Sequence, residues 1–347
     1  MSAGTENAAS FELVADDGAP LLEVEDLHVE FRTREGLAKA VNGVSYSVRA
    51  GETLAVLGES GSGKSVTAQA IMGILDTPPG FVTGGAVRFR GEDILKLPEE
   101  RRRALRGASM AMIFQDALSS LNPVFTVGWQ IGEMFRVHQG MSRKESKLRA
   151  IEMMDRVRIP SAKQRVNDYP HQFSGGMRQR VMIAMSIALN PALLIADEPT
   201  TALDVTVQAQ VMDLLAELQR ESGMGLILIT HDLGVVADVA DRIAVMYAGR
   251  IVETADARDL YAKPAHPYTK ALLGSIPRLD AKGQDIAVIG GLPPTLTKLP
   301  SGCSFHPRCR YMRPEPCQTE VPPLVSFEAN RGSACHFWQE VLDGTDR

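Results

Sequence analysis

The sequence predicts an α/β protein with a parallel sheet core, an antiparallel β subdomain, a helical subdomain and a small irregular C-terminal extension. Three observations lead to this prediction. Short apolar strands alternate with a helical segment between residues 193 and 247, which is typical of a parallel sheet. A glycine-rich loop joins a short apolar strand to a helix at residues 53–75. Proline-rich sequence without clear periodicity follows residue 263.

Four regions follow one another along the chain. Residues 1–20 are small, polar and acidic, without the basic and apolar regions of a secretory signal, and predict a mobile tail. The apolar segments LLEVEDLHVEF, AVNGVSYSV, TLAVL and AVRFR predict a mostly antiparallel sheet that leads into the glycine-rich loop. Helical spacing of apolar residues predicts a helical subdomain at about residues 116–189. We therefore expect one domain over residues 21–262 and an extension over residues 263–347.

The loop GESGSGKS at residues 58–65 has the pattern of a phosphate-binding loop. A polyphosphate needs converging backbone N–H donors, and glycine lets the backbone curl closely around it. A lysine then reaches the β- and γ-phosphates, and a hydroxyl binds Mg²⁺. A plain glycine turn is the alternative, but the flanking strand and helix argue against it. The predicted nucleotide-binding residues are Gly58, Glu59, Ser60, Gly61, Ser62, Gly63, Lys64, Ser65 and Val66.

Two adjacent carboxylates end the apolar strand LLIAD. Asp197 is suited to holding Mg²⁺, and Glu198 is suited to accepting a proton from an attacking water. An apolar run that ends in Asp-Glu is weak evidence alone, because many strands stop at a solvated turn. Together with the phosphate loop, the pair predicts a nucleotide hydrolase.

Three further positions become informative beside these motifs. Ser174, Gly175 and Gly176 begin a long helix and offer a second anion site, although a simple serine cap is the better interpretation of this segment by itself. His231 follows a strand expected to lie beside LLIAD and is placed to contact the γ-phosphate. Gln115 follows the strand AMIF and is placed to sense Mg²⁺ and the attacking water. Each residue would be unremarkable alone.

The order and spacing of these motifs resemble the ATP-binding cassette superfamily over residues 21–253. The resemblance implies a RecA-like core that binds ATP and Mg²⁺, with Gln115, Glu198 and His231 acting in hydrolysis. It also implies a head-to-tail pair of cassettes, in which the signature segment acts on the ATP of the partner. Met177 stands where glutamine is more usual in this segment. The family stacks adenine on an aromatic at the position of Phe31 and also contains the TALD segment, residues 201–204.

A narrower resemblance comes from HPYTKALL, GLPP and GCSFHPRC in the extension and from FQDALSSLNP at residues 114–123. They resemble the D-type ATPases of oligopeptide and dipeptide importers. This implies a second, F-type ATPase chain, two permease subunits, an extracytoplasmic peptide-binding protein, and a location at the cytoplasmic face of the membrane. Importers of nickel or glutathione share much of the pattern and remain alternatives.

All four cysteines lie in the extension, separated by five, seven and seventeen residues. The closely spaced pairs usual for zinc are absent, so we expect a thiolate metal site of another kind, with zinc and unliganded thiols as alternatives. The resemblance to the D-type subunits implies a 4Fe-4S cluster. His306, between two of the cysteines, is a further candidate ligand, with a packing role favoured. The expected ligands are Cys303, Cys309, Cys317 and Cys335.

Composition argues against other classes. The net charge of -5 gives no electrostatic footprint for nucleic acid, so we expect no nucleic-acid partner. The apolar runs are shorter than the roughly 18 residues of a transmembrane helix, and the chain is expected to be soluble. A soluble cassette ATPase of translation or DNA repair is a second hypothesis, but such proteins typically carry two cassettes, long inserts or basic surfaces. A metal-sensing extension with the cassette as its output is a third.

Overall fold

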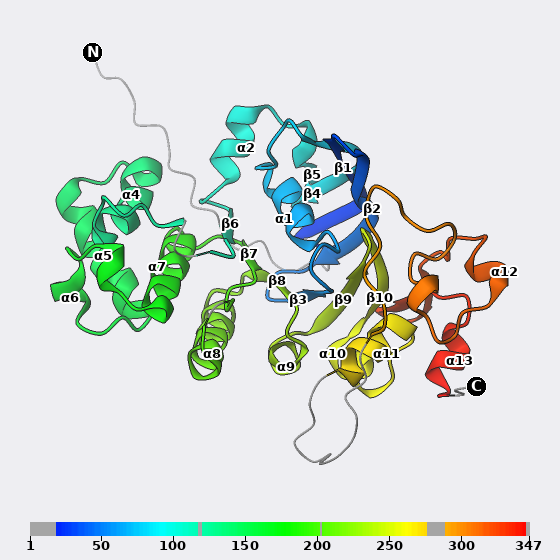
Figure 1. Ribbon diagram of the computed structural model, residues 1–347. Helices are drawn as coiled ribbons and strands as arrows, with labels where there is room; N and C mark the ends of the chain where they lie inside the picture. Colours follow the sequence, from blue (N-terminus) through cyan, green and yellow to red (C-terminus); the bar gives the residue numbers. More distant parts are fainter. Residues whose placement is uncertain (1–18, 117–119, 202, 276–288, 345–347) are drawn as a thin grey trace.

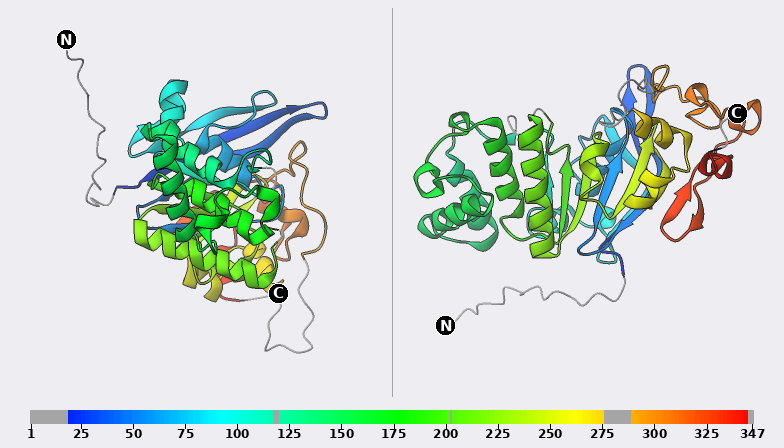
Figure 2. Two further views of the ribbon diagram at one scale, coloured as in Figure 1. Left: turned by 90° about the vertical axis from the view of Figure 1, so that its left-hand side faces the viewer. Right: turned by 90° about the horizontal axis from the view of Figure 1, so that it is seen from below.

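The computed structural model describes residues 19–116, 120–201, 203–275 and 289–344. Two sheets form the body of the molecule, the helices α4 to α7 lie at one end and the C-terminal extension lies at the other (Figures 1 and 2). The expected N-terminal tail lies almost wholly outside the described residues, and so do residue 202 of the TALD segment and residues 117–119.

The smaller sheet is antiparallel and has the order β2-β1-β4-β5. Strand β1 pairs with both β2 and β4, as the apolar segments around the loop predict. The segment TLAVL, residues 53–57, was predicted to belong to this antiparallel sheet. That prediction is wrong, because the segment forms β3 of the larger sheet. All five of its residues are buried, which is typical of a parallel strand covered on both faces. The strands are β1 (Leu22–Thr33), β2 (Gly36–Val48), β4 (Gly80–Phe89) and β5 (Glu92–Asp93).

The larger sheet has the order β11-β12-β10-β9-β3-β8-β7-β6. Its five strands from β9 to β6 are parallel, which confirms the prediction from strand and helix alternation. Their carboxyl ends therefore meet at one edge, where ligands bind in such sheets. The parallel strands are β3 (Thr53–Leu57), β6 (Met110–Ile113), β7 (Leu193–Asp197), β8 (Gly225–Thr230) and β9 (Arg242–Tyr247).

Both faces of the larger sheet are buried in separate apolar cores. In β3, Ala55 and Leu57 pack into the core shared with the helical subdomain, whereas Leu54 and Val56 pack into the core shared with the antiparallel sheet. This division follows from the alternation of side chains along a strand. The sheet is thus held rigid from both sides.

Helices cover these faces and form the insertion between β6 and β7 (Figure 1). Local capping fixes their starts: Ser142 and Glu145 form a reciprocal capping box, and Asp204 accepts a hydrogen bond from the Val207 N–H at 3.0 Å. None of the helices in the described part of the chain is long and apolar enough to cross a membrane. The helices that precede the extension are α1 (Lys64–Met72), η1 (Ile94–Lys96), α2 (Glu99–Leu105), α4 (Val127–Gln139), α5 (Arg143–Arg156), α6 (Ala162–Arg165), η2 (Pro170–Gln172), α7 (Gly175–Ile187), α8 (Val205–Ser222), α9 (Leu233–Val236) and α10 (Ala257–Ala262).

The C-terminal extension is joined to the cassette sheet. Strand β12 pairs antiparallel with β10, and the Ala334 N–H donates to the Val252 carbonyl at 2.8 Å. The extension is irregular elsewhere, as its prolines predict. Its strands β12 and β11 continue the eight-stranded sheet beyond β10, so the two parts share one hydrogen-bonded sheet. Strand β10 (Arg250–Asp256) belongs to the cassette. The elements of the extension are α11 (Pro267–Gly274), η3 (His306–Arg308), α12 (Pro314–Cys317), β11 (Val325–Glu328), β12 (Arg331–Ser333) and α13 (Trp338–Leu342).

A buried carboxyl at this junction makes stability depend on pH. Glu253 on β10 accepts backbone hydrogen bonds from Ala265 and His266 at 2.6 and 2.9 Å. Burial raises its pKa to about 7, whereas a glutamate in the unfolded chain titrates near about 4.3. Between these values the folded state holds a proton that the unfolded state has released, so the free energy of unfolding falls as pH rises.

We expect this loss to disappear in Glu253→Gln, whose side chain stays neutral. Urea unfolding at about pH 5 and about pH 8 should show the native protein losing roughly 2 to 3 kcal/mol more than the variant over this interval. The same loss in both proteins would contradict the assignment to Glu253.

Candidate active site

The phosphate loop leaves β3 at the carboxyl edge of the parallel sheet and enters α1. Two of its glycines are required by space as well as by conformation. Gly58 has φ +155°, and a Cβ there would lie 2.2 Å from the Met246 carbonyl oxygen. Gly63 has φ +105°, and a Cβ there would lie 2.3 Å from the Ala40 carbonyl oxygen. Only glycine fits both positions.

Lys64 and Ser65 are the first two residues of α1, and their side chains make different contacts. The Lys64 ammonium is buried and donates to the carbonyls of Gly58 and Glu59 at 2.8 and 3.0 Å. Burial lowers the pKa of Lys64, and the neighbouring carboxylates of Glu198 and Asp197 oppose that shift. The Ser65 hydroxyl donates to the Asp197 carboxylate at 2.9 Å. The Lys64 ammonium is therefore held by backbone carbonyls of the phosphate loop and interacts with the carboxylates of Asp197 and Glu198.

Asp197 ends β7 and Glu198 follows it directly, as the sequence predicts. Asp197 is 4% exposed, and burial raises the pKa of its carboxyl, while the hydrogen bond from Ser65 opposes the rise. The Ser65 hydroxyl and this carboxylate supply adjacent hard oxygen donors, which suit Mg²⁺. Glu198 has φ +46°, a left-handed conformation rare for a glutamate, and its N–H donates to the Ile229 carbonyl at 2.8 Å.

Three side chains converge on the Glu198 carboxylate. Gln115 donates to it at 2.8 Å, Thr201 donates to it at 2.9 Å, and His231 Nδ1 lies 3.3 Å from its other oxygen. Gln115 follows β6 and His231 follows β8, and both strands flank β7, so parallel pairing brings the three ends together. The expected pairing of the His231 strand with LLIAD is confirmed. The Thr201 contact had no signal in the sequence beyond its place in the TALD segment.

The signature segment lies apart from this network. Ser174 caps α7 by accepting a hydrogen bond from the Met177 N–H at 3.4 Å, and Ser174 and Gly175 are exposed. No hydrogen bond within the described residues joins residues 174–177 to the phosphate loop. Phe31 lies on β1 of the antiparallel sheet, half-buried opposite Gly80. The signature segment and Phe31 thus lie apart from the Glu198 network in the single chain.

The loop also has contacts that no motif predicted. The Glu59 N–H donates to the Tyr268 hydroxyl at 2.9 Å, and the Glu59 carboxylate binds Arg308 through two hydrogen bonds of 2.7 and 3.0 Å. Ser62 supports the loop from the other side, since its carbonyl accepts from the Gly249 N–H at 2.9 Å. The partners of Glu59 are 209 and 249 residues away in the chain, beyond the reach of any local pattern.

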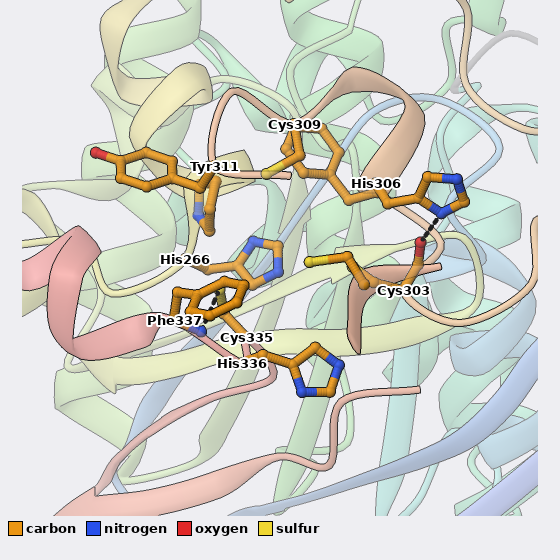
Figure 3. Close-up of a pocket in the computed structure, with 11 residues that line it drawn as sticks. His266, Cys303, His306, Cys309, Tyr311, Cys335, His336 and Phe337 are labelled. Carbon is orange, nitrogen blue, oxygen red and sulfur yellow. Dashed lines mark hydrogen bonds between the residues drawn. The ribbon is translucent and has the colours of Figure 1, made fainter. Parts of the chain in front are cut away.

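The four cysteines line one small cavity of about 10 Å³ in the extension. Figure 3 shows Cys303, Cys309 and Cys335 arranged around His266. Burial raises the pKa of Cys309 and of Cys335 to about 12 each, and neighbouring thiols add to the shift. His306 is turned to the Cys303 carbonyl, 2.9 Å from its Nδ1. Across the described ranges, no group of three or more His, Cys, Asp or Glu is arranged to hold a metal ion.

Comparisons with known proteins agree with this geometry. Residues 41–201 match the family model of the ABC transporter, and residues 252–317 match that of the oligopeptide/dipeptide transporter C-terminal region. The chain is 52% identical to the oligopeptide transport ATP-binding protein OppD of Salmonella typhimurium over 91% of this chain and 93% of that protein. The chain belongs to the ABC transporter ATPases.

Other relatives and solved structures place this ABC ATPase in the same group. It is 52% identical to the dipeptide transport ATP-binding protein DppD of Bacillus subtilis, over 83% of this chain and 86% of that one. A dimeric ATP-binding cassette solved in a post-hydrolysis state with ADP and Pi is 27% identical, with a TM-score of 0.62, over 68% of this chain and 99% of the other. The predicted fold class and ATPase activity are confirmed.

Space around the loop glycines predicts a sharp contrast between two substitutions. We expect Gly58→Ala to weaken Mg-ATP binding by at least about tenfold, because the new methyl group would collide with the Met246 carbonyl and shift the loop. Gly140→Ala is the matched control, because Gly140 follows α4 outside the loop and also has a positive φ, +65°, but no atom lies within 4 Å of the place that its methyl group would take. Calorimetric titration of both variants measures the difference. Equal affinities would contradict the steric explanation.

Proposed function

We propose that this ABC ATPase powers the import of oligopeptides or dipeptides through partner permeases. The match of residues 252–317 to the oligopeptide/dipeptide transporter C-terminal region carries the proposal, supported by relatives named for peptide transport. A peptide-binding protein and a second, F-type ATPase chain would complete the assembly at the cytoplasmic face of the membrane. Nickel or glutathione import is the alternative.

Uptake measurements separate these solutes. Cells that lack the gene should lose uptake of labelled dipeptides and oligopeptides and recover it with the native chain. Normal peptide uptake with lost nickel or glutathione uptake would overturn the peptide assignment without affecting the ATPase assignment.

In hydrolysis, Glu198 is the proposed general base. A water attacks the γ-phosphorus of ATP, the bond to the β-γ bridging oxygen breaks, and Glu198 accepts the proton from the water. Gln115 donates a hydrogen bond to this carboxylate and His231 Nδ1 lies 3.3 Å from it, so both would orient the carboxylate and the water. Ser65 and Asp197 would hold Mg²⁺, which supplies charge neutralisation at the phosphates when bound. Lys64 and the loop N–H groups bind the phosphates.

The exposed start of α7 supports a composite site. Ser174 and Gly175 are exposed, and Gly176 and Met177 are half-buried beside them at the helix N-terminus, which is favourable for an anion. We propose that they close on the nucleotide of a partner cassette, while Phe31 stacks on the adenine of its own. Closure by ATP and reopening after hydrolysis would move the helical subdomain, residues 116–189, against the permeases.

Replacement of the base tests the chemistry directly. We expect Glu198→Gln to bind Mg-ATP with native affinity and to hydrolyse it at least about 100-fold more slowly, because an amide cannot accept the proton. Glu221→Gln, an exposed site on α8, makes the same chemical change away from the loop and should retain native activity. Phosphate release by the assembled complex is the measurement, and turnover of Glu198→Gln near the native rate would refute the role.

We further propose that Cys303, Cys309, Cys317 and Cys335 hold a 4Fe-4S cluster. The donor set fits, because four thiols share one cavity walled mainly by aromatic rings. The cavity has room for about one water, so the cluster would need the side chains to move outward. The cluster would supply cross-linking of the extension.

Elemental analysis tests this assignment independently of ATPase activity. Protein purified without oxygen should contain about four iron and four sulfide per chain and show visible absorbance, and Cys309→Ser should lose both. His306→Ala should keep them, because the His306 ring is turned to a carbonyl. Stoichiometric zinc without iron, or native protein free of metal, would overturn the cluster. If metal changes the ATPase rate of the native protein but not that of a variant with all four cysteines replaced by serine, the extension acts as a metal sensor.

A further inference from the structure

The carboxylate and the N–H of Glu59, the second residue of the phosphate loop, are both bound from the C-terminal part of the chain. Its carboxylate accepts two hydrogen bonds from the Arg308 guanidinium, at 2.7 and 3.0 Å, and its N–H donates to the Tyr268 hydroxyl at 2.9 Å. The Arg308 side chain is 5% exposed and that of Glu59 is 26% exposed. Paired hydrogen bonds between a guanidinium and a carboxylate are strong and directional. The pair therefore restrains this residue of the loop.

Arg308 is itself fixed before it reaches the loop. Its Nε donates to the Gly290 carbonyl at 3.0 Å, and its Nη1 lies 3.3 Å from the Tyr247 hydroxyl. Behind it, the rings of Tyr247 and Phe305 pack edge to face with centroids 5.2 Å apart. A guanidinium already held by two partners loses little further freedom when it binds a carboxylate. This arrangement differs from an exposed ion pair of two mobile chains.

The charge of Glu59 lies beside the part of the loop that receives the phosphates. The Lys64 ammonium donates to the Glu59 carbonyl at 3.0 Å, and the Glu59 carboxylate is one of the charges that oppose the lowering of the Lys64 pKa. An uncompensated carboxylate at this place would repel an incoming polyphosphate. Arg308 cancels that charge while it holds the loop.

We propose that Arg308 is a positioning residue of the nucleotide site, acting through Glu59 to set the affinity for ATP. It need not touch the nucleotide. Arg308 ends the η3 turn between Cys303 and Cys309, where the Arg308 N–H donates to the Phe305 carbonyl at 3.0 Å. The cysteine-bearing extension thus contributes to ATP binding. The assignment depends on neither the transported solute nor the metal, so either proposal above can fail without affecting it.

Substitution of Arg308 should change binding more than chemistry. We expect Arg308→Ala to weaken Mg-ADP binding and raise the KM for ATP by about tenfold, with kcat at saturating ATP within about twofold of native. Arg308→Lys keeps the positive charge but cannot form the paired hydrogen bonds, so its affinity for Mg-ADP should lie between those of the native protein and Arg308→Ala. Arg310→Ala removes the same charge two residues further on, at an exposed position, and should bind as the native chain does.

A second substitution distinguishes this role from simple structural support. Adding Glu59→Gln to Arg308→Ala removes the uncompensated carboxylate, so the double variant should recover most of the lost affinity. Calorimetry with Mg-ADP on the full chain measures all variants, and thermal unfolding shows whether each is folded. Native affinity in Arg308→Ala, or a loss that Glu59→Gln does not reduce, would overturn the proposal. If Arg308→Ala does not fold, Arg308→Lys decides the question, and native affinity there would overturn it.

Discussion

The hydrogen bond between Ser65 and Asp197 depends on the register of three parallel strands. Strand β8 pairs with β3 on one side and with β7 on the other, so the phosphate loop and the paired carboxylates leave the sheet at the same edge. A slip of one residue in either pairing would turn every side chain of that strand to the other face. Burial of both faces in separate cores prevents such a slip. The rest of the site is built around this alignment.

Burial acts in opposite directions on the charges of the site. It lowers the pKa of Lys64 and raises that of Asp197, so each group is less favourable as an ion than it would be in water. Their proximity offsets part of that cost, and the left-handed backbone at Glu198 adds local strain. These groups are already oriented, because neighbouring strands and helix α1 hold them. A charged ligand therefore meets dipoles and ions that need little rearrangement.

Motifs with fixed spacing could be predicted because their chemistry limits both residue type and position. The glycines, Lys64 and Asp197 follow from what a polyphosphate and its metal require, and parallel pairing then places Gln115 and His231. The Glu59 contacts with Tyr268 and Arg308 could not be predicted, because such long-range pairs leave no periodicity in a single sequence. Strand β12, of three residues, is too short to show alternation. The segment TLAVL was assigned to the wrong sheet, because tertiary packing decides which strands pair and the sequence of one strand does not show its partners.

The two members of the Glu59 and Arg308 pair are made at different times. With 249 residues between them, a ribosome that adds about 5 to 20 residues per second produces Arg308 roughly 12 to 50 s after Glu59. During that interval the nascent chain has its phosphate-loop glycines and Lys64, but the Glu59 carboxylate beside them lacks its paired guanidinium. Nucleotide capture would then mature late in translation, after the cassette motifs themselves have been synthesised. Chains interrupted before the extension would carry the whole set of cassette motifs and still bind nucleotide poorly.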